Sequence, residues 1–274
     1  MFTKKKEKRY TNPMNSWSLR RKRIIFLVTL LCLVILVGVP LFFFMHRAPT
    51  CTDTIMNGDE SGVDCGGSCQ LLCRNQSLPM LSKGDPRLIE VATSTFETVI
   101  VVQNPNISAS VERAGFTFKL FSATSSVPLK VIEGITFIPR SSTFALFEGP
   151  YVFEGARPIR STFEWKQDTL IWKRDQSIVP NLFVQSGILT NALSAPRLDG
   201  SVKNNSLENI LNIELVALIT DPNANIIGAS KTFVESLAPG VENNLIFTWP
   251  RPFVGTTTSV EILPRVLPDI SYIR

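Results

Sequence analysis

Histidine is almost absent from this chain, because His46 is the only one among 274 residues. A Ser-His-Asp or Cys-His mechanism needs an imidazole base beside its nucleophile, and His46 directly follows a long apolar run. A nucleophile elbow, a phosphate-binding loop and histidine-bearing metal motifs are also missing. These absences predict that the chain is not an enzyme. Paired carboxylates would be the remaining route to hydrolysis, through glutamates in or near expected strands: Glu133, Glu148, Glu154 and Glu164.

Charge is absent from Ile24 to Met45, a run of 22 residues that directly follows Arg20 to Arg23. As a helix this run would span about 33 Å, enough to cross the hydrocarbon core of a bilayer. A cleaved signal peptide has a shorter apolar region, of about 7–15 residues, and small residues at its cleavage site. The sequence therefore predicts an uncleaved signal anchor that makes the chain an integral membrane protein.

The distribution of charge predicts how the chain is oriented. Residues 1–23 hold nine Lys or Arg and one acidic residue, a net of +8, whereas the remainder holds nineteen basic and twenty-two acidic residues, a net of −3. Positive residues stay on the cytoplasmic side, so we expect a single pass of the plasma membrane with the N-terminus cytoplasmic and residues 46–274 extracytoplasmic. The basic excess lies in the membrane-proximal tail, which argues against nucleic acid as a partner.

Cysteine is scarce as well, and four of the five cysteines lie within 23 residues just after the apolar run: Cys51, Cys65, Cys69 and Cys73. An even number in an oxidising compartment favours two disulfides, for which three pairings are possible. A four-cysteine zinc site is the alternative, although its usual signature is two close pairs and Cys51 stands apart from the other three. The fifth, Cys32, lies inside the apolar run.

The acidic residues between these cysteines raise the possibility of calcium as a cofactor. If Asp53 is the first position of a twelve-residue loop, Asn57 is the fifth and Asp64 the twelfth, where an EF-hand loop has oxygen ligands. Asp59 would add another carboxylate. The match is partial, since Ile55 holds the third position, and the alternative is a solvated turn in which Asn57-Gly58 and Gly66-Gly67 adopt positive φ.

Beyond Cys73 no helical periodicity persists, and short runs rich in β-branched and aromatic residues alternate with turn residues. Residues 116–120 alternate apolar and polar, whereas 99–102 and 210–219 are runs rich in β-branched residues. Anchor residues recur with a shift of 100: Val102, Asn104, Phe147, Pro150, Phe153 and Gly155 as Val202, Asn204, Phe247, Pro250, Phe253 and Gly255. A repeat of this size corresponds to one sandwich domain.

The predicted fold class is therefore all-β, with two tandem immunoglobulin- or fibronectin-like β-sandwiches carried on a single N-terminal transmembrane helix with a short disulfide-rich neck. The expected segments are a basic cytoplasmic tail at 1–23, the transmembrane helix at 24–45, a cysteine-rich neck and linker at 46–83, the first sandwich at 84–166, a linker at 167–181 and the second sandwich at 182–270.

Two segments resemble known families. Residues 51–73, with Asn57 to Glu60 and the close Cys65-Gly66-Gly67-Ser68-Cys69, resemble a short cysteine motif of secreted and surface-attached bacterial proteins. Residues 198–204, the run 213–219, the turn 221–225 and the Pro239-Gly240 turn are similar to the FxLYD type of immunoglobulin-like domain, although the Phe-x-Leu-Tyr-Asp signature itself is absent. These resemblances imply a cross-linked module outside the cell and a non-catalytic spacer or adhesion domain.

Two functions fit these observations. The preferred one is a membrane-anchored envelope protein that displays its sandwiches outside the cell for adhesion or assembly with other surface proteins. The alternative is a carbohydrate-binding module or degenerate glycoside hydrolase that acts on cell-wall glycans. Three tryptophans would serve such binding if they formed an exposed row, although a tryptophan in a sandwich strand is more often core: Trp165, Trp172 and Trp249.

Overall fold

The computed structural model describes residues 14–45 and 50–268. Residues 1–13, 46–49 and 269–274 lie outside the described residues, and with them most of the predicted cytoplasmic tail, the start of the neck and the last residues predicted for the second sandwich. The chain divides into an N-terminal unit that ends at Asp53 and a C-terminal unit that begins at Thr54. Each unit is described separately.

The N-terminal unit consists of one apolar helical stretch. It comprises α1 (Met14–Leu33), the π-helical turn η1 (Val34–Gly38) and α2 (Val39–Met45). The π-helical turn ends two residues before Pro40. Proline has no N–H group to donate to a helical carbonyl, and such a local change of register is one way in which a helix accommodates it. Within it, Trp17–Phe43 is long and apolar enough to cross a membrane.

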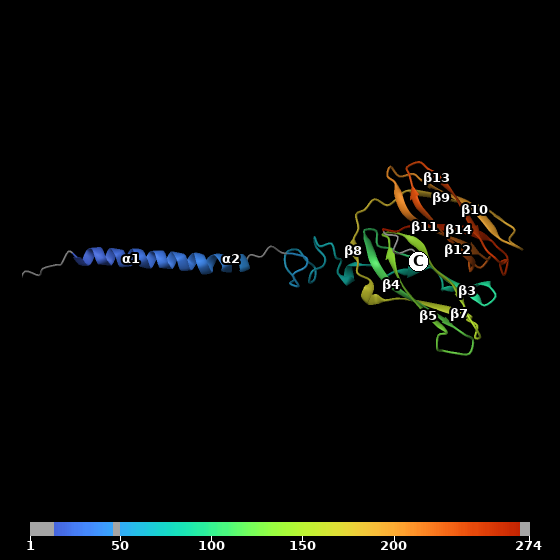
Figure 1. Ribbon diagram of the computed structural model, residues 1–274, viewed down its shortest axis with the longest axis horizontal. Helices are drawn as coiled ribbons and strands as arrows, with labels where there is room; N and C mark the ends of the chain where they lie inside the picture. The colour runs from blue at the N-terminus through green and yellow to red at the C-terminus, as the bar shows by residue number, and fades with distance from the viewer. Residues whose placement is uncertain (1–13, 46–49, 269–274) are drawn as a thin grey trace, which may run out of the picture. The chain divides into compact units, whose positions relative to one another are not determined.

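The C-terminal unit is built from antiparallel strands that form two pairs of facing sheets (Figure 1). In the first sheet pair, one sheet contains β1 (Leu81–Ser82), β2 (Arg87–Ala92), β3 (Thr95–Gln103) and β6 (Thr143–Val152). Its facing sheet contains β4 (Ala109–Phe121), β5 (Lys130–Ile138), β7 (Arg160–Trp165) and β8 (Lys173–Arg174). Side chains such as Phe118, Leu120 and Phe144 fill the core between the two sheets.

The second sheet pair repeats this arrangement. One sheet contains β9 (Leu182–Thr190), β10 (Arg197–Asn204) and β13 (Glu242–Thr248), and the other contains β11 (Ile210–Thr220), β12 (Ile226–Leu237) and β14 (Ser259–Val266). Leu198, Leu215 and Phe247 lie in its core. The expectation of an all-β fold that follows a single N-terminal apolar helix is confirmed for the described residues, whereas the number of independently folding domains stays a prediction.

The asparagines that mark the internal repeat have the same structural role in both sheet pairs. Asn104 is buried, its Nδ2 donates to the carbonyl oxygens of Ala109 and Pro139, and its Oδ1 accepts the N–H of Asn106. Asn204 makes the same set of bonds, to the carbonyl oxygens of Glu208 and Leu237 and from the N–H of Ser206. A buried amide with three such bonds ties the start of one strand to the end of another, which explains why asparagine occupies both positions.

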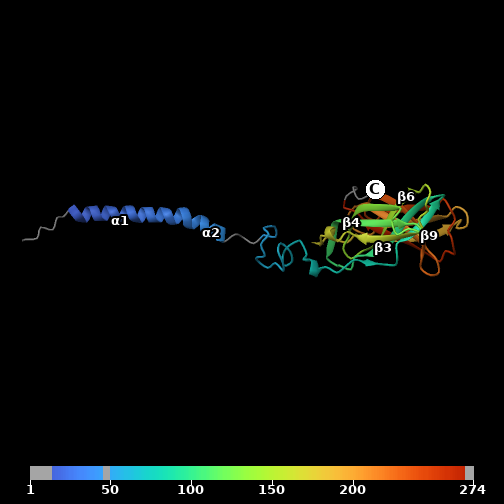
Figure 2. The same ribbon diagram turned by 90° about the horizontal axis from the view of Figure 1, so that it is seen from below.

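A third apolar core joins the two sheet pairs to each other. The sheet of β2, β3 and β6 packs face to face on the sheet of β11, β12 and β14. Figure 1 shows the strands of the second sheet pair, in orange and red, beside those of the first, and Figure 2 gives the view from below. The buried side chains of this core are Ile89, Val99, Val101, Ala145, Val216, Leu218, Ala229 and Leu263. Both middle sheets are therefore covered on both faces, so β3 and β11 each contain a continuous apolar stretch, at 99–102 and 215–219, instead of alternation throughout.

The segment expected as a linker at 167–181 contributes to the first sheet pair and to the neck. It contains the 3₁₀ turn η3 (Gln167–Thr169) and β8, and its Trp172 is buried in the first core. The neck runs alongside it, because Leu72 N–H donates to Trp172 O over 3.0 Å and Arg174 N–H donates to Gln70 O over 2.7 Å. Backbone hydrogen bonds thus fix residues 70–72 to the first sheet pair.

Candidate functional site

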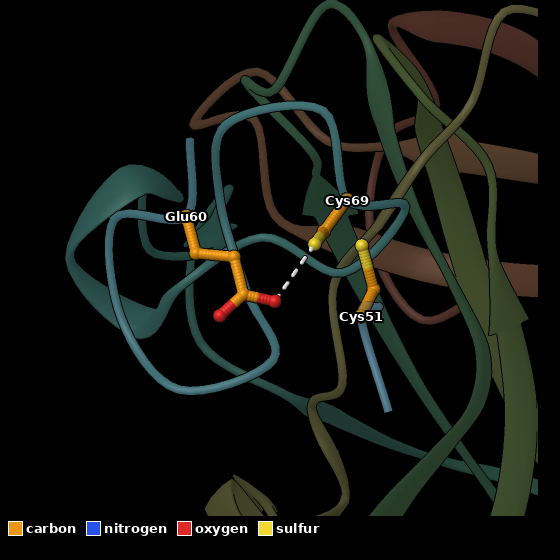
Figure 3. A group of neighbouring side chains, drawn as sticks. All are labelled: Cys51, Glu60 and Cys69. Carbon is orange, nitrogen blue, oxygen red and sulfur yellow. Dashed lines mark hydrogen bonds between the residues drawn. The ribbon is translucent and has the colours of Figure 1, made fainter. Parts of the chain in front are cut away.

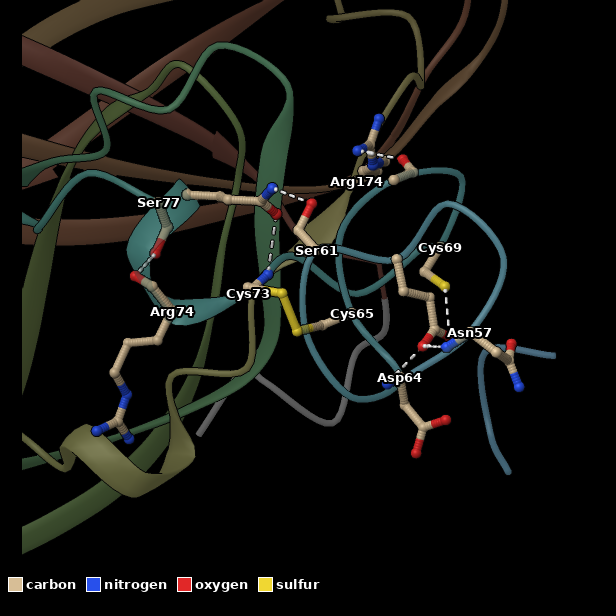
Figure 4. The surroundings of a disulfide bond; sticks show 12 residues. Asn57, Ser61, Asp64, Cys65, Cys69, Cys73, Arg74, Ser77 and Arg174 are labelled. Atoms are coloured by element: carbon tan, nitrogen blue, oxygen red, sulfur yellow. Dashed lines mark hydrogen bonds between the residues drawn. A yellow bond between two sulfur atoms is a disulfide. The ribbon is translucent and has the colours of Figure 1, made fainter. Parts of the chain in front are cut away.

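The neck cysteines are the first candidate site. All four are disulfide-bonded, and Cys65 is joined to Cys73 with their Cα atoms 5.0 Å apart (Figure 4). The prediction of two disulfides is confirmed, with the pairing that contains the Cys65–Cys73 bond. A zinc site of the kind weighed from the sequence needs thiolates, and a sulfur in a disulfide has no proton to lose. Cys32, in the apolar helix, is free and exposed.

Two glycines allow the loop to close around these cysteines. Gly66 and Gly67 have φ of +78° and +53°, values that L side chains rarely adopt. A Cβ on Gly67 would lie 1.9 Å from Asp59 O, and one on Gly66 would lie 2.6 Å from the Cβ of Ser61. The Cys-Gly-Gly-x-Cys spacing therefore follows from close packing of backbone against backbone.

Glu60 organises the same loop from inside. Its Oε2 accepts the N–H groups of Asn57 and Asp64 at 3.2 and 3.3 Å, and its Oε1 lies 3.4 Å from Cys69 Sγ (Figure 3). Since the sulfur of a disulfide carries no proton, the contact with Cys69 is a packing contact when Glu60 is ionised. Glu60 thus satisfies backbone donors of the loop, which is a structural role.

The residues predicted to bind calcium already have partners within the loop. The Asp64 carboxylate accepts the N–H of Thr54 at 2.9 and 3.1 Å, and Asp59 Oδ1 accepts the hydroxyl of Ser68 at 2.8 Å. Asn57 is half-buried, and Asp53 is the last residue of the N-terminal unit. These bonds describe a compact turn, and calcium binding stays a prediction.

The three tryptophans do not form an exposed row. Trp172 and Trp249 are buried, and Trp249 Nε1 donates to Ala229 O over 2.8 Å. Trp165 is half-buried and packs edge-on against Phe163 with ring centroids 5.0 Å apart. Trp172 and Trp249 therefore have no open face for a sugar ring, and Trp165 serves the core of the first sheet pair.

A pocket of about 420 Å³ lies where the two sheet pairs meet, and it is the second candidate site. The first sheet pair contributes walls from β4, β5 and β6, and the second contributes walls from β11, β12 and β14. Its charged lining consists of four cations, Arg113, Lys166, Lys231 and Arg265, and three carboxylates, Glu133, Glu148 and Glu214. The pocket has the size of a small-molecule site.

A buried hydrogen-bond network forms the deepest wall of this pocket. Arg265 donates through Nε and Nη2 to Glu214 Oε1 at 3.0 and 2.5 Å, and through Nη1 to Thr136 Oγ1 at 2.7 Å. Arg265, Glu214 and Thr136 are all buried, and the Arg265 guanidinium lies over the ring of Phe144 at 4.7 Å. Because Thr136 belongs to the first sheet pair and Arg265 to the second, the network fixes the register of one pair on the other.

Burial raises the pKa of two carboxyl groups near this wall. Desolvation raises the pKa of Glu97 to about 7, against the attraction of Lys231. Desolvation also raises the pKa of Glu148, which accepts a hydrogen bond from the Tyr151 hydroxyl at 3.2 Å and again faces Lys231. Lys231 Nζ lies 3.9 Å from Glu214 Oε2. Burial at the edge of the interface between the sheet pairs therefore favours the neutral form of both carboxyl groups.

No family model matches this chain, and no curated protein matches it. Among solved structures, one match is a beta-glucuronidase from glycoside hydrolase family 2, at 12% identity and a TM-score of 0.20. The match covers 81% of this chain and 29% of that protein, so the chain spans under a third of its length. A similarity this low carries no argument about function.

The sequence analysis identified only some of the residues that line the pocket. Of the four glutamates considered for hydrolysis, Glu133 and Glu148 line the pocket, whereas Glu164 forms an ion pair with Lys119 on the outer face of the first sheet pair. Glu214 and Arg265 were missed. Their signal was a charge inside an apolar strand, since Glu214 interrupts Ile213 to Ile219, and a charge in such a place needs a buried partner.

Proposed function

We propose that this protein is a non-catalytic, single-pass membrane protein that displays its β-sheet unit outside the cell for adhesion or assembly with other surface components. The observation that carries this proposal is the pair of disulfides that follows the apolar helix so closely. Disulfides persist in oxidising compartments and are rare in the cytosol. The N-terminal helix supplies the route to such a compartment.

The orientation rests on the basic residues before the helix. Arg20, Arg21, Lys22 and Arg23 directly precede the uncharged run, which favours a cytoplasmic N-terminus and places the disulfides on the opposite side. The helix is also longer than the apolar region of a signal peptide, since Trp17–Phe43 has 27 residues. The length of the helix supports a retained anchor.

The outer sheet of the second sheet pair offers a surface for a protein partner. Phe183, Ile188 and Ile246 on β9 and β13 have exposed fractions of 53%, 77% and 52%. Leu193 and Leu207, in the loops beside these strands, are exposed by 91% and 96%. Exposed apolar side chains gathered on one sheet are typical of protein contact surfaces. The resemblance to surface-protein cysteine modules and to FxLYD-like domains supports the same role.

The topology is tested with the full chain in intact cells. After reduction, a membrane-impermeant maleimide is expected to label the neck cysteines, and before reduction it should not label them. Protease added outside should remove a C-terminal epitope tag while a tag before Met1 stays protected. Labelling of the neck thiols without reduction, or protection of the C-terminal tag, would contradict the proposal. A mature chain that lacks the helix would contradict retention of the anchor.

The alternative role, binding of cell-wall glycans, is supported by the charged pocket between the sheet pairs. Full-length protein in detergent micelles can be passed over cell-wall polymers and over immobilised envelope proteins. The preferred role predicts retention by proteins and not by polymers. Retention on polymers alone would favour the alternative.

A further inference from the structure

The pocket between the sheet pairs exists only because the two repeats pack together. Thr136 and Glu148 come from the first sheet pair, whereas Glu214, Lys231 and Arg265 come from the second. Small-molecule sites occur preferentially at such junctions, and 420 Å³ is enough for a molecule of about one sugar ring. Neither repeat alone could supply the walls.

The floor of the pocket is held in place before any ligand arrives. Arg265 has all three of its nitrogens hydrogen-bonded, to Glu214 and to Thr136, and its guanidinium is covered by Phe144. Gly134 also lines the pocket, and an added Cβ there would come within 2.3 Å of the ring of Phe116. A preorganised wall reduces the conformational entropy that a ligand must remove on binding.

The charged lining of the pocket as a whole carries more positive than negative groups. Arg113 is exposed and forms no ion pair within the part of the chain that the structure describes, whereas Lys166 pairs with Glu133 at 3.0 Å. Four cations face three carboxylates, and burial raises the pKa of Glu148, which favours its neutral form. The excess of positive charge therefore grows when Glu148 holds its proton.

Two apolar side chains also line the pocket. Phe147 and Ile135 line the pocket, and Ile135 has an exposed fraction of 50%. Lys231 Nζ lies 5.6 Å from the centroid of the Phe147 ring, so the cation and the apolar surface are neighbours. A ligand with an anionic group and a compact ring would match both.

We propose that this pocket binds a small organic anion, a carboxylate or phosphate attached to a body of about one sugar ring, with the anionic group between Arg113 and Lys231 and the ring against Phe147 and Ile135. The proposal is independent of which face of the membrane holds the unit. It adds a ligand site to a protein whose display role rests on the helix and the disulfides.

Three sugars test the proposal by isothermal titration against the full chain in detergent micelles: galacturonate, galactose 1-phosphate and galactose. At least one of the two anions is expected to bind at least about tenfold more tightly than galactose, a difference equal to roughly one charge-assisted contact. The two anionic probes distinguish a carboxylate ligand from a phosphate ligand. Equal binding of galactose, or no binding of either anion at about ten millimolar, overturns the proposal.

Variants locate the site. Arg113→Gln and Lys231→Gln should each weaken binding of the anion by about tenfold, because each removes one positive charge from the lining of the pocket. Lys119→Gln is the matched control, since Lys119 lies on β4 like Arg113 but does not line the pocket and pairs with Glu164. Binding that is insensitive to both pocket variants, or that falls equally in the control, places the anion elsewhere and overturns the proposal. Unchanged circular dichroism and melting temperature show that the variants are folded.

Discussion

The two sheet pairs share one strand order, yet they differ in what covers the outer face of corresponding sheets. In the first pair, Lys119 on β4 and Glu164 on β7 lie on an outer face and form a solvent-exposed ion pair. In the second pair, Leu218 on β11 and Leu263 on β14 hold the corresponding places and are buried against the first pair. The inner faces of β4 and β11 are apolar in both. The residues shared by the two repeats thus form the core of each sandwich. The residues on the outer faces, which differ between the repeats, determine which sheets pack against each other.

The other two sheets show the reverse: here the outer face is buried in the first pair and open to solvent in the second. Val99 and Val101 on β3 are buried in the core between the pairs, whereas Asp199 and Ser201 on β10 stand on the open face of the second pair. Two copies of one sandwich have therefore diverged on complementary faces, so that one stacked unit with three apolar cores results. Fully burying a Val or Leu contributes about 1.5–3 kcal/mol, so this third core is a substantial part of the stability.

The largest expected effect comes from placing a charged residue at position 218 of the second pair, which corresponds to the charged Lys119 of the first pair. Leu218→Asp places an unpaired carboxylate in the core between the pairs, which should lower the free energy of unfolding by about 4 kcal/mol or more. The measurement is urea denaturation of the full chain in detergent. Lys119→Ser, at the corresponding place in the first pair, should change stability by less than about 1 kcal/mol. Equal losses would show that the outer faces are equivalent after all.

A smaller and symmetric effect is expected from the repeated asparagines. Asn104→Ala and Asn204→Ala each remove the side-chain hydrogen bonds to two carbonyl oxygens and from one N–H, at a cost of about 3 kcal/mol. Hydrogen exchange should show faster opening in the altered sheet pair first. Asn205→Ala, at an exposed neighbour, is the control and should be close to neutral. A loss of stability at only one of the two positions would mean that the two asparagines do not contribute equally to their sheet pairs.

The pH dependence should distinguish the interface from the rest of the molecule. The pKa of Glu97 is raised to about 7 in the folded protein from 4.5, so the folded state binds the proton more tightly. Its contribution to stability is fully present below pH 4.5 and is lost as the pH rises through 7. Glu148 acts in the same direction.

Because Glu97 is partly exposed, solvent screening reduces this contribution to about 1–2 kcal/mol. Denaturation at pH 5 and at pH 8 measures it. The Glu97→Gln variant, which cannot ionise, should retain more of its stability at pH 8 than the unaltered chain does. If stability rises between these two pH values and the variant behaves alike, the carboxyl of Glu97 is not the group responsible.

Much of this fold could be predicted from the sequence because its signals are local or periodic. The uncharged run at 24–45, the cluster of neck cysteines and the 100-residue shift between Asn104 and Asn204 each reflect constraints that act within one element or one repeat. The continuous apolar stretch 215–219 also indicated more than the presence of a strand, since a strand without alternation is covered on both faces. The absence of alternation predicts that both faces of the strand are buried, but it does not indicate which sheet covers the outer face.

The pocket could not be predicted because its parts are far apart in the chain. Arg265 is 51 residues from Glu214 and 129 residues from Thr136, and only the stacking of the two pairs brings them together. Glu148 looked like an ordinary strand acid, and its raised pKa comes from burial beneath the second repeat. The identity of such a site depends on long-range packing, which a single sequence does not display.

The smallest effect should come from the exposed ion pair that marks the solvent face of the first pair. Lys119 and Glu164 lie 3.0 Å apart, but their side chains are 34% and 62% exposed, so solvent screens the attraction. A double-mutant cycle with Lys119→Gln and Glu164→Gln should give a coupling below about 1 kcal/mol that decreases further in about 0.5 M salt, which screens exposed charges. Arg265 and Glu214 are each only 5% exposed, and removing one of them alone should cost about 3–5 kcal/mol because the other charge stays buried. A coupling at the exposed pair as large as that loss would contradict the distinction between an open face and a covered one on which the comparison of the two repeats rests.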